Sequence, residues 1–303
     1  MKCRRHGGRR HFPVMLTEVL ELLAPARPRL ILDCTVGLGG HAEALLERTG
    51  AEAELVGIDL DQSNLLKTKE RLARFGERVR LFQANFADAE EVLAAAGHRA
   101  ADAVLADLGV ASSQLDDPAR GFSFQLDGPL DMRMGSEGPT AADLVNGLSE
   151  AELAEAIRRY GDERFSKRIA RAIVRARRDC PIRRTAELAR VVREAYPPPA
   201  RHRSRIDPAT RTFQAIRILV NRELENLAML LEKLPRLLSR GGRAVVISFH
   251  SGEDRLVKRA FAAAERASRC RLLTPRVRRP GAEEVGRNPP SRSARLRAIE
   301  RID

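Results

Sequence analysis

The residues best suited to bind a ligand follow an apolar segment, Leu30–Leu32, and read Asp33-Cys34-Thr35-Val36-Gly37-Leu38-Gly39-Gly40-His41. Glycines in such a loop allow the backbone to approach a ligand closely at the start of the helix expected over 42–48. A second apolar segment, Leu55–Ile58, ends on Asp59, whose carboxylate can accept hydrogen bonds from ribose hydroxyls. The two features together predict a site for a nucleotide-type cofactor.

The spacing of the glycines narrows the class of cofactor. The loop is not G-x-G-x-x-G, the pattern that holds a dinucleotide pyrophosphate at a helix N-terminus. Gly37, Gly39 and Gly40 are packed more closely, which suits a ligand without phosphate, such as S-adenosylmethionine. The alternatives are a glycine turn that only packs strand against helix and, for Asp59, a helix N-cap. Asp61 is the better placed residue for that cap.

Two further candidates lie where strands are expected to end. Phe86 follows the strand expected over 79–83, and it could lie against an adenine ring or pack in the core. Asp107 ends the strand expected over 103–107. An exocyclic amine on a nucleobase is a poor nucleophile because its lone pair is delocalised, and a carboxylate that binds the amino hydrogens localises that pair. Asp107 could act in this way, or it could hold the ammonium group of the cofactor.

Three other side chains have both a functional and a structural interpretation. His250 follows a late apolar segment, 243–249, and could orient a substrate or be hydrogen-bonded locally. Phe122 and Phe124 are candidates for stacking on a target base, and packing in a core is the alternative for both.

The elements that must position these residues alternate between strand and helix. Strands are expected over 30–33, 55–59, 79–83 and 103–107, with helices between them, for example over 64–75. This pattern predicts an α/β, Rossmann-like core with a mostly parallel sheet and helices on both sides. After Asp107 the chain turns repeatedly and enters an Arg-rich helical region, 150–196. A long helix is expected over 212–238, then a strand over 243–249 and a final edge strand over 294–302.

The break in this pattern predicts an interrupted domain. We expect a core in two parts, 1–114 and 210–303, around an inserted helical domain, 115–209, that recognises the substrate. Ligands of open α/β sheets bind outside the carboxyl ends of the strands. An insert that leaves from the edge at Asp107 can therefore overhang the active site.

The distribution of charge favours a polyanionic partner. The chain of 303 residues has a formal net charge of +13, yet residues 1–110 carry 15 basic and 16 acidic side chains. Residues 151–211 carry 17 basic and 8 acidic side chains, and residues 240–303 carry 16 and 7. A genome-wide bias toward Arg would not segregate charge in this way, so nucleic acid is favoured. We expect phosphate contacts from Arg201, Arg203, Arg205, Arg211 and Arg217. The alternative is that these arginines form a solvated face.

Several other classes of site are disfavoured. The cysteines, Cys3, Cys34, Cys180 and Cys270, lie far apart and the histidines are scattered, so no metal site is expected. Free thiols suit a reducing cytosol. There is no apolar run long enough to span a membrane, and the basic N-terminus lacks the apolar segment of a secretory signal. A cytoplasmic location without membrane association is expected.

A series of ordered motifs resembles the bacterial 16S ribosomal RNA (cytosine-N4) methyltransferases of the RsmH (MraW) family. These motifs are His11–Leu16, Asp33–His41, Asp107–Asp116, Arg120–Phe124, Asp127–Met134, Tyr160–Phe165, Pro208–Ala215 and Ser248–Ser251. The chain departs from the family pattern at Ser113, where Pro is usual, and at Gly252, where Leu is usual.

The resemblance implies S-adenosylmethionine-dependent methylation of N4 of a cytidine in the P-site (decoding) region of 16S rRNA, within ribosome biogenesis. It also implies a Rossmann-like core with an inserted recognition domain. Carried over motif by motif, Asp107 is the catalytic candidate, and Gln114 is assigned by the resemblance alone. The implied cofactor-binding residues are Gly39, Gly40, His41, Asp59, Phe86, Asp107 and Gln114.

Two other function classes explain fewer of these features than an rRNA methyltransferase does. A nicotinamide oxidoreductase is disfavoured because the G-x-G-x-x-G loop and a hydride-transfer constellation are missing. A non-catalytic RNA-binding assembly factor would explain the basic insert but not the glycine loop with Asp59 and Asp107. Catalysis by positioning is expected, without a covalent enzyme intermediate. The sequence leaves open whether free rRNA or an assembled subunit is the substrate, and which oligomeric state forms.

Overall fold

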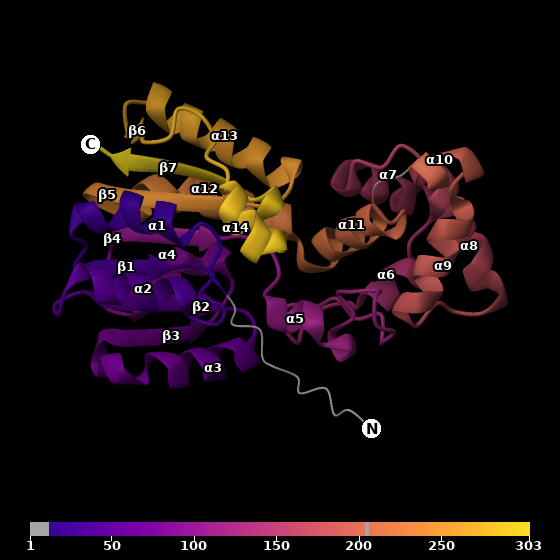
Figure 1. Ribbon diagram of the computed structural model, residues 1–303, viewed down its shortest axis with the longest axis horizontal. Coiled ribbons are helices and arrows are strands. Elements are labelled where there is room, and N and C mark those ends of the chain that lie inside the picture. Colours follow the sequence, from indigo (N-terminus) through magenta and orange to yellow (C-terminus); the bar gives the residue numbers. More distant parts are fainter. Residues whose placement is uncertain (1–11, 204–205) are drawn as a thin grey trace. The chain divides into compact units, whose positions relative to one another are not determined.

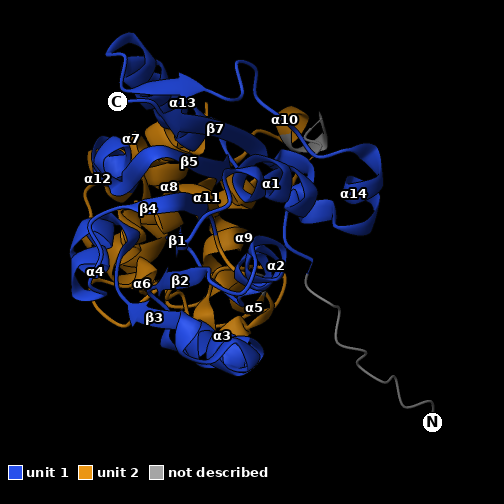
Figure 2. Cartoon of the chain, turned by 90° about the vertical axis from the view of Figure 1, so that its left-hand side faces the viewer, with its two compact units in different colours: residues 1–109, 227–303 blue, residues 110–226 orange. Residues whose placement is uncertain are grey.

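A computed structural model describes residues 12–203 and 206–303, leaving aside the side chains of Ser112 and of residues 201–203. The chain forms two compact units, one of residues 1–109 and 227–303 and one of residues 110–226 (Figure 2). No helix of the described residues has the length and apolar character needed to cross a membrane.

The first unit is built on a seven-stranded sheet in the order β3-β2-β1-β4-β5-β7-β6 (Figure 1). The strands β3, β2, β1, β4 and β5 pair in parallel, whereas β7 pairs antiparallel with both β5 and β6. This arrangement confirms the predicted Rossmann-like core. The strands are β1 (Leu30–Asp33), β2 (Glu54–Asp59), β3 (Val79–Gln83), β4 (Ala101–Asp107), β5 (Leu238–Ser248), β6 (Cys270–Leu272) and β7 (Arg295–Arg301).

Both faces of the sheet are buried, which explains why its central strands are almost entirely apolar. Successive side chains point to opposite faces, so Leu30 and Leu32 join one core and Ile31 joins the other. One face is covered by α1 (Leu16–Leu23), α2 (Gly40–Thr49) and α3 (Gln62–Leu72). The other face is covered by α4 (Ala89–Ala95), α12 (Glu223–Leu237) and α13 (Ser251–Arg266).

Short helices complete the first unit. They are α14 (Ala282–Arg287) and the 3₁₀ turns η1 (Ala24–Ala26), η2 (Ala73–Arg78), η3 (Phe86–Asp88) and η5 (Pro289–Ser293).

The second unit is helical, and its core gathers Ile157, Ile169, Ile173, Leu188 and Phe213 from four helices. Side-chain caps set where two of its helices begin, because Thr140 and Ser149 each form a capping box with the acid three residues on. Its helices are α5 (Ser112–Asp116), α6 (Ala141–Gly147), α7 (Glu150–Gly161), α8 (Ser166–Asp179), α9 (Thr185–Ala195), α10 (Pro198–Arg203) and α11 (Ala209–Asn221), with the 3₁₀ turn η4 (Pro118–Arg120).

The single long helix expected over 212–238 is wrong. The chain forms α11 and α12 instead, and Arg222 between them has φ 50°, in the left-handed region. Glycine is the usual residue in that conformation, so an arginine gave no sign of a break. The apolar periodicity continues on both sides of Arg222, so the sequence pattern predicted one helix where the chain forms two.

The final strand also differs from expectation. β7 does not lie at the edge of the sheet, because β6 pairs with its outer side from Cys270 to Leu272. Three residues are too few for the alternating pattern that identifies a strand in a sequence. The edge position therefore belongs to β6.

The compact helical unit, 110–226, is longer at both ends than the expected insert, 115–209. Helix α11 belongs to it because α11 packs closely on α7. A Cβ at Gly161 would lie 2.5 Å from the Arg211 carbonyl oxygen, so only glycine permits this approach of the two backbones.

Candidate cofactor and catalytic site

Three aspartates end three neighbouring strands of the first unit at the carboxyl edge of its sheet. Asp59 ends β2, Asp33 ends β1 and Asp107 ends β4. The chain leaves β1 toward β2 on one side, and β4 pairs with β1 on the other side. The carboxyl ends of β1 and β4 therefore flank the switch point where open α/β sheets bind their ligands.

A chain of hydrogen bonds joins the ends of β1 and β4. The Thr35 backbone N–H donates to Asp33 Oδ1 at 3.1 Å, and Thr35 Oγ1 accepts the Asp107 backbone N–H at 2.6 Å. Asp33 is only 1% exposed. Burial raises the pKa of Asp33 to about 7, and the negative charges of Asp107 and Asp59 act in the same direction against a lowering by His41 and the Thr35 N–H.

Asp59 holds the glycine loop in place. Its Oδ2 accepts the Gly37 backbone N–H at 2.9 Å, and its Oδ1 accepts the Asp61 backbone N–H at 2.7 Å. Burial raises the pKa of Asp59 to about 6. Asn64 Nδ2 donates a third, longer bond to Asp59 Oδ2 at 3.4 Å. An ionised carboxylate offers about four acceptor positions, so one position is left for a ribose hydroxyl. Asp61 caps α3 through the Ser63 backbone N–H, as predicted.

The loop glycines are explained in part by packing within the protein. A Cβ at Gly40 would lie 2.6 Å from Pro13 Cγ, and Gly39 has φ +76° with Thr68 against it. Thr68 Oγ1 also donates to the Gly37 carbonyl oxygen at 2.6 Å. As the N-cap of α2, Gly39 brings no side chain over the first turn, whose N–H groups have no acceptor within a helix.

His41 and Asp107 lie against each other at this edge. His41 Nε2 lies 3.5 Å from Asp107 Oδ2, and the two side chains are 8% and 22% exposed. Both His41 ring nitrogens and Asp107 Oδ1 are buried without a hydrogen-bond partner among the described residues. Such atoms are rare in folded proteins and mark places where a ligand can complete the bonding.

The charges at this edge suit a cationic ligand. Asp33, Asp59 and Asp107 are carboxylates, and among the described residues His41 is the basic side chain in ionic contact with Asp107. Three carboxylates in a buried setting repel one another, and a bound cation relieves that repulsion. S-adenosylmethionine carries a sulfonium and an ammonium group, so these carboxylates fit this cofactor.

The comparisons with known proteins agree with this geometry. The sequence matches the MraW methylase family over residues 8–302. The chain belongs to the MraW methylase family. A "Ribosomal RNA small subunit methyltransferase H" from Desulfosudis oleivorans is 45% identical over 97% of this chain and 99% of its own length. The protein of the same description from Syntrophobacter fumaroxidans is 48% identical over 96% of each chain.

This membership confirms the predicted family and makes the chain a methyltransferase that uses S-adenosylmethionine. Among solved structures, an rRNA methylase from Streptococcus thermophilus is 11% identical, with a TM-score of 0.43, over 95% of this chain and 94% of its own. The strand order of the sheet shows the Rossmann-like fold of the first unit.

Six of the seven residues predicted for the cofactor of this MraW-family protein lie in the first unit. They are Gly39, Gly40, His41, Asp59, Phe86 and Asp107. Phe86, in η3, is half-buried and packs against the core that also contains α4 and α12. Gln114 lies in the second unit, where its Oε1 accepts the Ala111 backbone N–H at 3.1 Å.

Several sequence-based alternatives are decided by local contacts. His250 caps α13, since its Nδ1 accepts the Glu253 backbone N–H at 3.3 Å, so local bonding accounts for that nitrogen, whereas its Nε2 is buried without a hydrogen-bond partner among the described residues. Phe122 is buried in the core of the second unit. Phe124 packs edge-to-face on Phe213, with ring centroids 4.8 Å apart. Both phenylalanines therefore serve the helical core rather than base stacking.

The arginines assigned to phosphates do not share one environment. Arg217 forms two 2.8 Å hydrogen bonds with Glu223, and both side chains are mostly buried, so a phosphate contact by Arg217 is wrong. Arg211 stays half-exposed and donates to the Asp162 carbonyl oxygen at 3.1 Å. Arg205 lies outside the described residues, as do Cys3 and His11, and the Arg201 and Arg203 side chains are not described.

Sequence reasoning gave no role to Asp33 and Thr35, which tie the two central strands together. The signal available in the sequence was a carboxylate at the end of a wholly apolar strand. Burial of a carboxylate costs free energy unless partners or a ligand compensate the charge. Cys34, beside them, is buried, and burial raises the pKa of its thiol. A buried neutral thiol is a poor nucleophile, in keeping with catalysis that forms no covalent enzyme intermediate.

Proposed function

We propose that this protein transfers a methyl group from S-adenosylmethionine to N4 of a cytidine in the P-site region of 16S rRNA. The observation that carries the proposal is the Oδ1 of Asp107, which is buried without a hydrogen-bond partner in the described part of the chain, at the switch point of an acidic sheet edge. The small-subunit rRNA methyltransferases that are similar over nearly the whole chain supply the substrate class.

The cofactor-binding residues are Gly39, Gly40, His41, Asp59, Phe86, Asp107 and Gln114. The first turn of α2, with no side-chain cap at Gly39, suits the cofactor carboxylate. Asp59 suits the ribose hydroxyls and Phe86 suits the adenine. When bound, S-adenosylmethionine supplies an electrophilic methyl group on a positively charged sulfur.

Asp107 acts on the amino group of the target cytidine. Its carboxylate accepts an N4 hydrogen, which localises the nitrogen lone pair, and it can take the proton that the amino group loses. The Thr35 hydroxyl fixes the backbone of Asp107 by accepting its N–H at 2.6 Å, so the carboxylate is held at a defined place. The remaining contribution is positioning of the amino group in line with the methyl donor. The target base must be unpaired or flipped out to reach this edge.

The helical unit recognises the RNA. Along α8 it exposes a row of basic side chains, Lys167, Arg168, Arg171, Arg175 and Arg178, that would contact phosphates and make binding salt-dependent. A role in ribosome biogenesis places the protein in the cytoplasm, and the substrate is the small subunit or its rRNA.

The test is to incubate the protein with methyl-labelled S-adenosylmethionine and small ribosomal subunits that lack the modification. Mass spectrometry of the digested rRNA should find one labelled N4-methylcytidine in the P-site region. Free 16S rRNA in a parallel reaction distinguishes naked RNA from the assembled subunit as substrate. Label on another base, or none while the cofactor binds, would overturn the proposal.

A further inference from the structure

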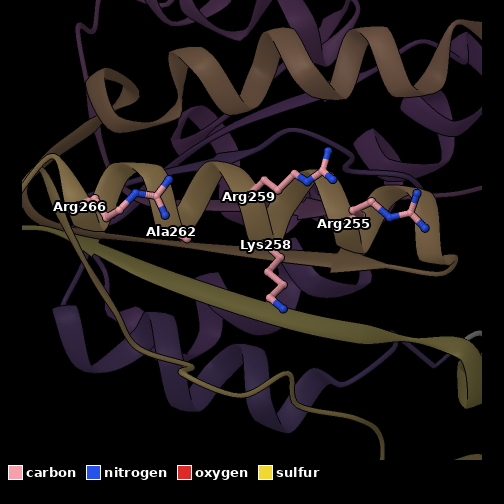
Figure 3. Close-up of a pocket in the computed structure, with 5 residues that line it drawn as sticks. All are labelled: Arg255, Lys258, Arg259, Ala262 and Arg266. Carbon is pink, nitrogen blue, oxygen red and sulfur yellow. The ribbon is translucent and has the colours of Figure 1, made fainter.

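One face of α13 in the first unit carries a concentrated positive charge. Arg255, Lys258, Arg259 and Arg266 are exposed there together with the partly exposed Ala262. Their spacing of three, four, seven and eleven residues from Arg255 places all five on one side of the helix. Figure 3 shows these side chains spaced along the length of α13. We call this set the α13 face.

The cations of the α13 face have no ion-pair or hydrogen-bond partner within the described ranges, in contrast to Arg71, Arg236 and Arg271 of the same unit. Arg71 pairs with Glu43 at 2.7 Å, and Arg236 pairs with Glu90 at 2.8 Å. Asp254, the acid next to Arg255, is engaged elsewhere, because it pairs with Arg297 at 2.7 Å. The charge of the α13 face is therefore not neutralised locally.

The α13 face is also concave and rigidly supported. Its five residues line a shallow hollow of about 400 Å³. The small side chain of Ala262 separates Arg259 from Arg266 and leaves room between the two guanidinium groups. On its opposite side, α13 buries Val257 and Phe261 in the core of the sheet, which fixes the helix as a platform.

The helix connects the α13 face to the catalytic edge of the same unit. α13 begins just after β5, and Ile247 of β5 pairs in register with Asp107 of β4. Arg255 thus lies in the second turn from the edge that holds Asp107. At 1.5 Å per residue, the distance along the helix from Arg255 to Arg266 is about 16 Å, enough to contact several phosphates of one strand.

We propose that the α13 face binds the phosphate backbone of the RNA substrate. This inference rests on the proposed function and adds to it a second phosphate-binding surface, on the catalytic unit. Arginine-rich surfaces without acidic partners suit phosphates because the guanidinium donates two parallel hydrogen bonds. Such contacts position RNA without reading its sequence, so the α13 face contributes affinity and register.

The test compares two charge-reversal variants of the full chain. Arg255→Glu/Arg259→Glu alters the α13 face, and Lys67→Glu/Lys69→Glu makes the same charge change at two exposed residues of α3. Binding of unmodified small subunits and of free 16S rRNA is measured over a salt series, with KM and kcat for methylation. The dissociation constant for S-adenosylmethionine reports whether each variant is folded.

The α13 variant should bind RNA about tenfold or more weakly than the α3 variant near 0.1 M salt. Its slope of log affinity against log salt should be smaller by about 1.4 to 1.8. KM for RNA should rise while kcat at saturating RNA and cofactor affinity stay unchanged. Equal RNA affinity of the two variants would overturn the inference. A loss confined to assembled subunits would also overturn it, because a ribosomal protein would then be the partner. Failure of the unaltered protein to methylate either RNA would instead refute the proposed function.

Discussion

Buried acids in the two units of the molecule have different surroundings. In the helical unit, Glu163 is 1% exposed and is surrounded by donors: the Tyr196 hydroxyl, the Phe165 backbone N–H at 2.8 Å and the Arg211 guanidinium at 3.8 Å. In the sheet unit, Asp107 Oδ1 is buried and has no partner among the described residues. The first acid is bonded within the fold, whereas the second is open to a ligand.

Burial also raises the pKa values of ionisable groups in both units. Burial and the hydrogen bond to Glu163 raise the pKa of Tyr196, so the Tyr196 hydroxyl keeps its proton and donates to Glu163. Burial raises the pKa of Asp33 to about 7 and of Asp59 to about 6, and for Asp59 it outweighs the hydrogen bonds from Gly37, Asp61 and Asn64. Both aspartates lie at the strand ends where open α/β sheets bind ligands, so their raised pKa values make them candidates for function.

The largest expected effect lies in the helical unit. Glu163→Ala leaves the Tyr196 hydroxyl and the Phe165 N–H without an acceptor in the core, so the free energy of unfolding should fall by about 3 to 5 kcal/mol. Denaturant unfolding measures this loss. The control is Glu155→Ala, which breaks the exposed pair with Arg158 and should cost less than about 1 kcal/mol. Similar losses in both variants would contradict a special role for the Glu163 cluster.

In the sheet unit the expected sign is opposite. The pKa of Asp33 rises from 3.8 to about 7 on folding, so the native state binds a proton that the unfolded state releases between these pH values. Stability therefore falls as pH rises from about 4 to about 7. Asp33→Asn keeps an acceptor for the Thr35 N–H without the charge. At pH 8 it should stabilise the cofactor-free protein by up to about 4 kcal/mol.

The same variant should lose function while it gains stability. Its preference for S-adenosylmethionine over the product, whose sulfur is a neutral thioether, should weaken, because the acidic edge loses one carboxylate. Thermal unfolding at pH 5 and pH 8 and competitive binding of the two ligands provide the measurements. A variant less stable than the unaltered protein at pH 8 would show that Asp33 is compensated like Glu163.

How far the sequence predicted this contrast depends on the kind of signal. Asp59 and Asp107 were identified because each ends an apolar strand, and parallel strands bring their carboxyl ends to one edge. The 3.5 Å approach of His41 to Asp107 could not be foreseen, because it depends on how α2 packs after the loop. Gln114 lies on a five-residue helix without a periodic pattern, and only the family resemblance pointed to it.

The fold shows the same limits. The first four strands were predicted within two residues, as with Ala101–Asp107 against 103–107, whereas β5 begins at Leu238, five residues before the predicted start. Breaks that depend on one backbone conformation were missed, as at Arg222. The partners of a charged side chain were also out of reach: Arg217 looked like a surface arginine until the structure placed Glu223 against it.

Asp107 is the acid of the sheet unit that is open to a ligand. Asp107→Ala should lower kcat for methylation by about 100-fold or more, the usual loss when a preorganised polar group that acts in the transition state is removed. RNA affinity should remain largely intact. Asp88→Ala, at an exposed acid of the same unit, is the control. Full methylation by the Asp107 variant, measured by mass spectrometry of the rRNA, would remove Asp107 from the mechanism.

Cofactor affinity separates the two roles that Asp107 can have. If the carboxylate acts on the cytidine amino group, the dissociation constant for S-adenosylmethionine changes little while kcat falls. If it holds the cofactor ammonium group, that constant rises together with the loss of rate. Asp107→Asn keeps the size of the side chain and should show the same pattern as the alanine variant, since the amide is a weaker proton acceptor.

The smallest expected effect is at Asp59. This acid is intermediate between Glu163 and Asp107, because both of its oxygens already accept backbone N–H groups. Asp59→Asn can replace only one of these acceptors, so S-adenosylmethionine should bind about tenfold more weakly, roughly 1.4 kcal/mol. Since the pKa of Asp59 is about 6, cofactor affinity of the unaltered protein should fall as pH drops through 6, a dependence that the variant lacks. Asp61→Asn, which preserves the cap of α3, is the matched control. Equal cofactor affinity of both variants at pH 8 would make Asp59 a purely structural acid, like Glu163.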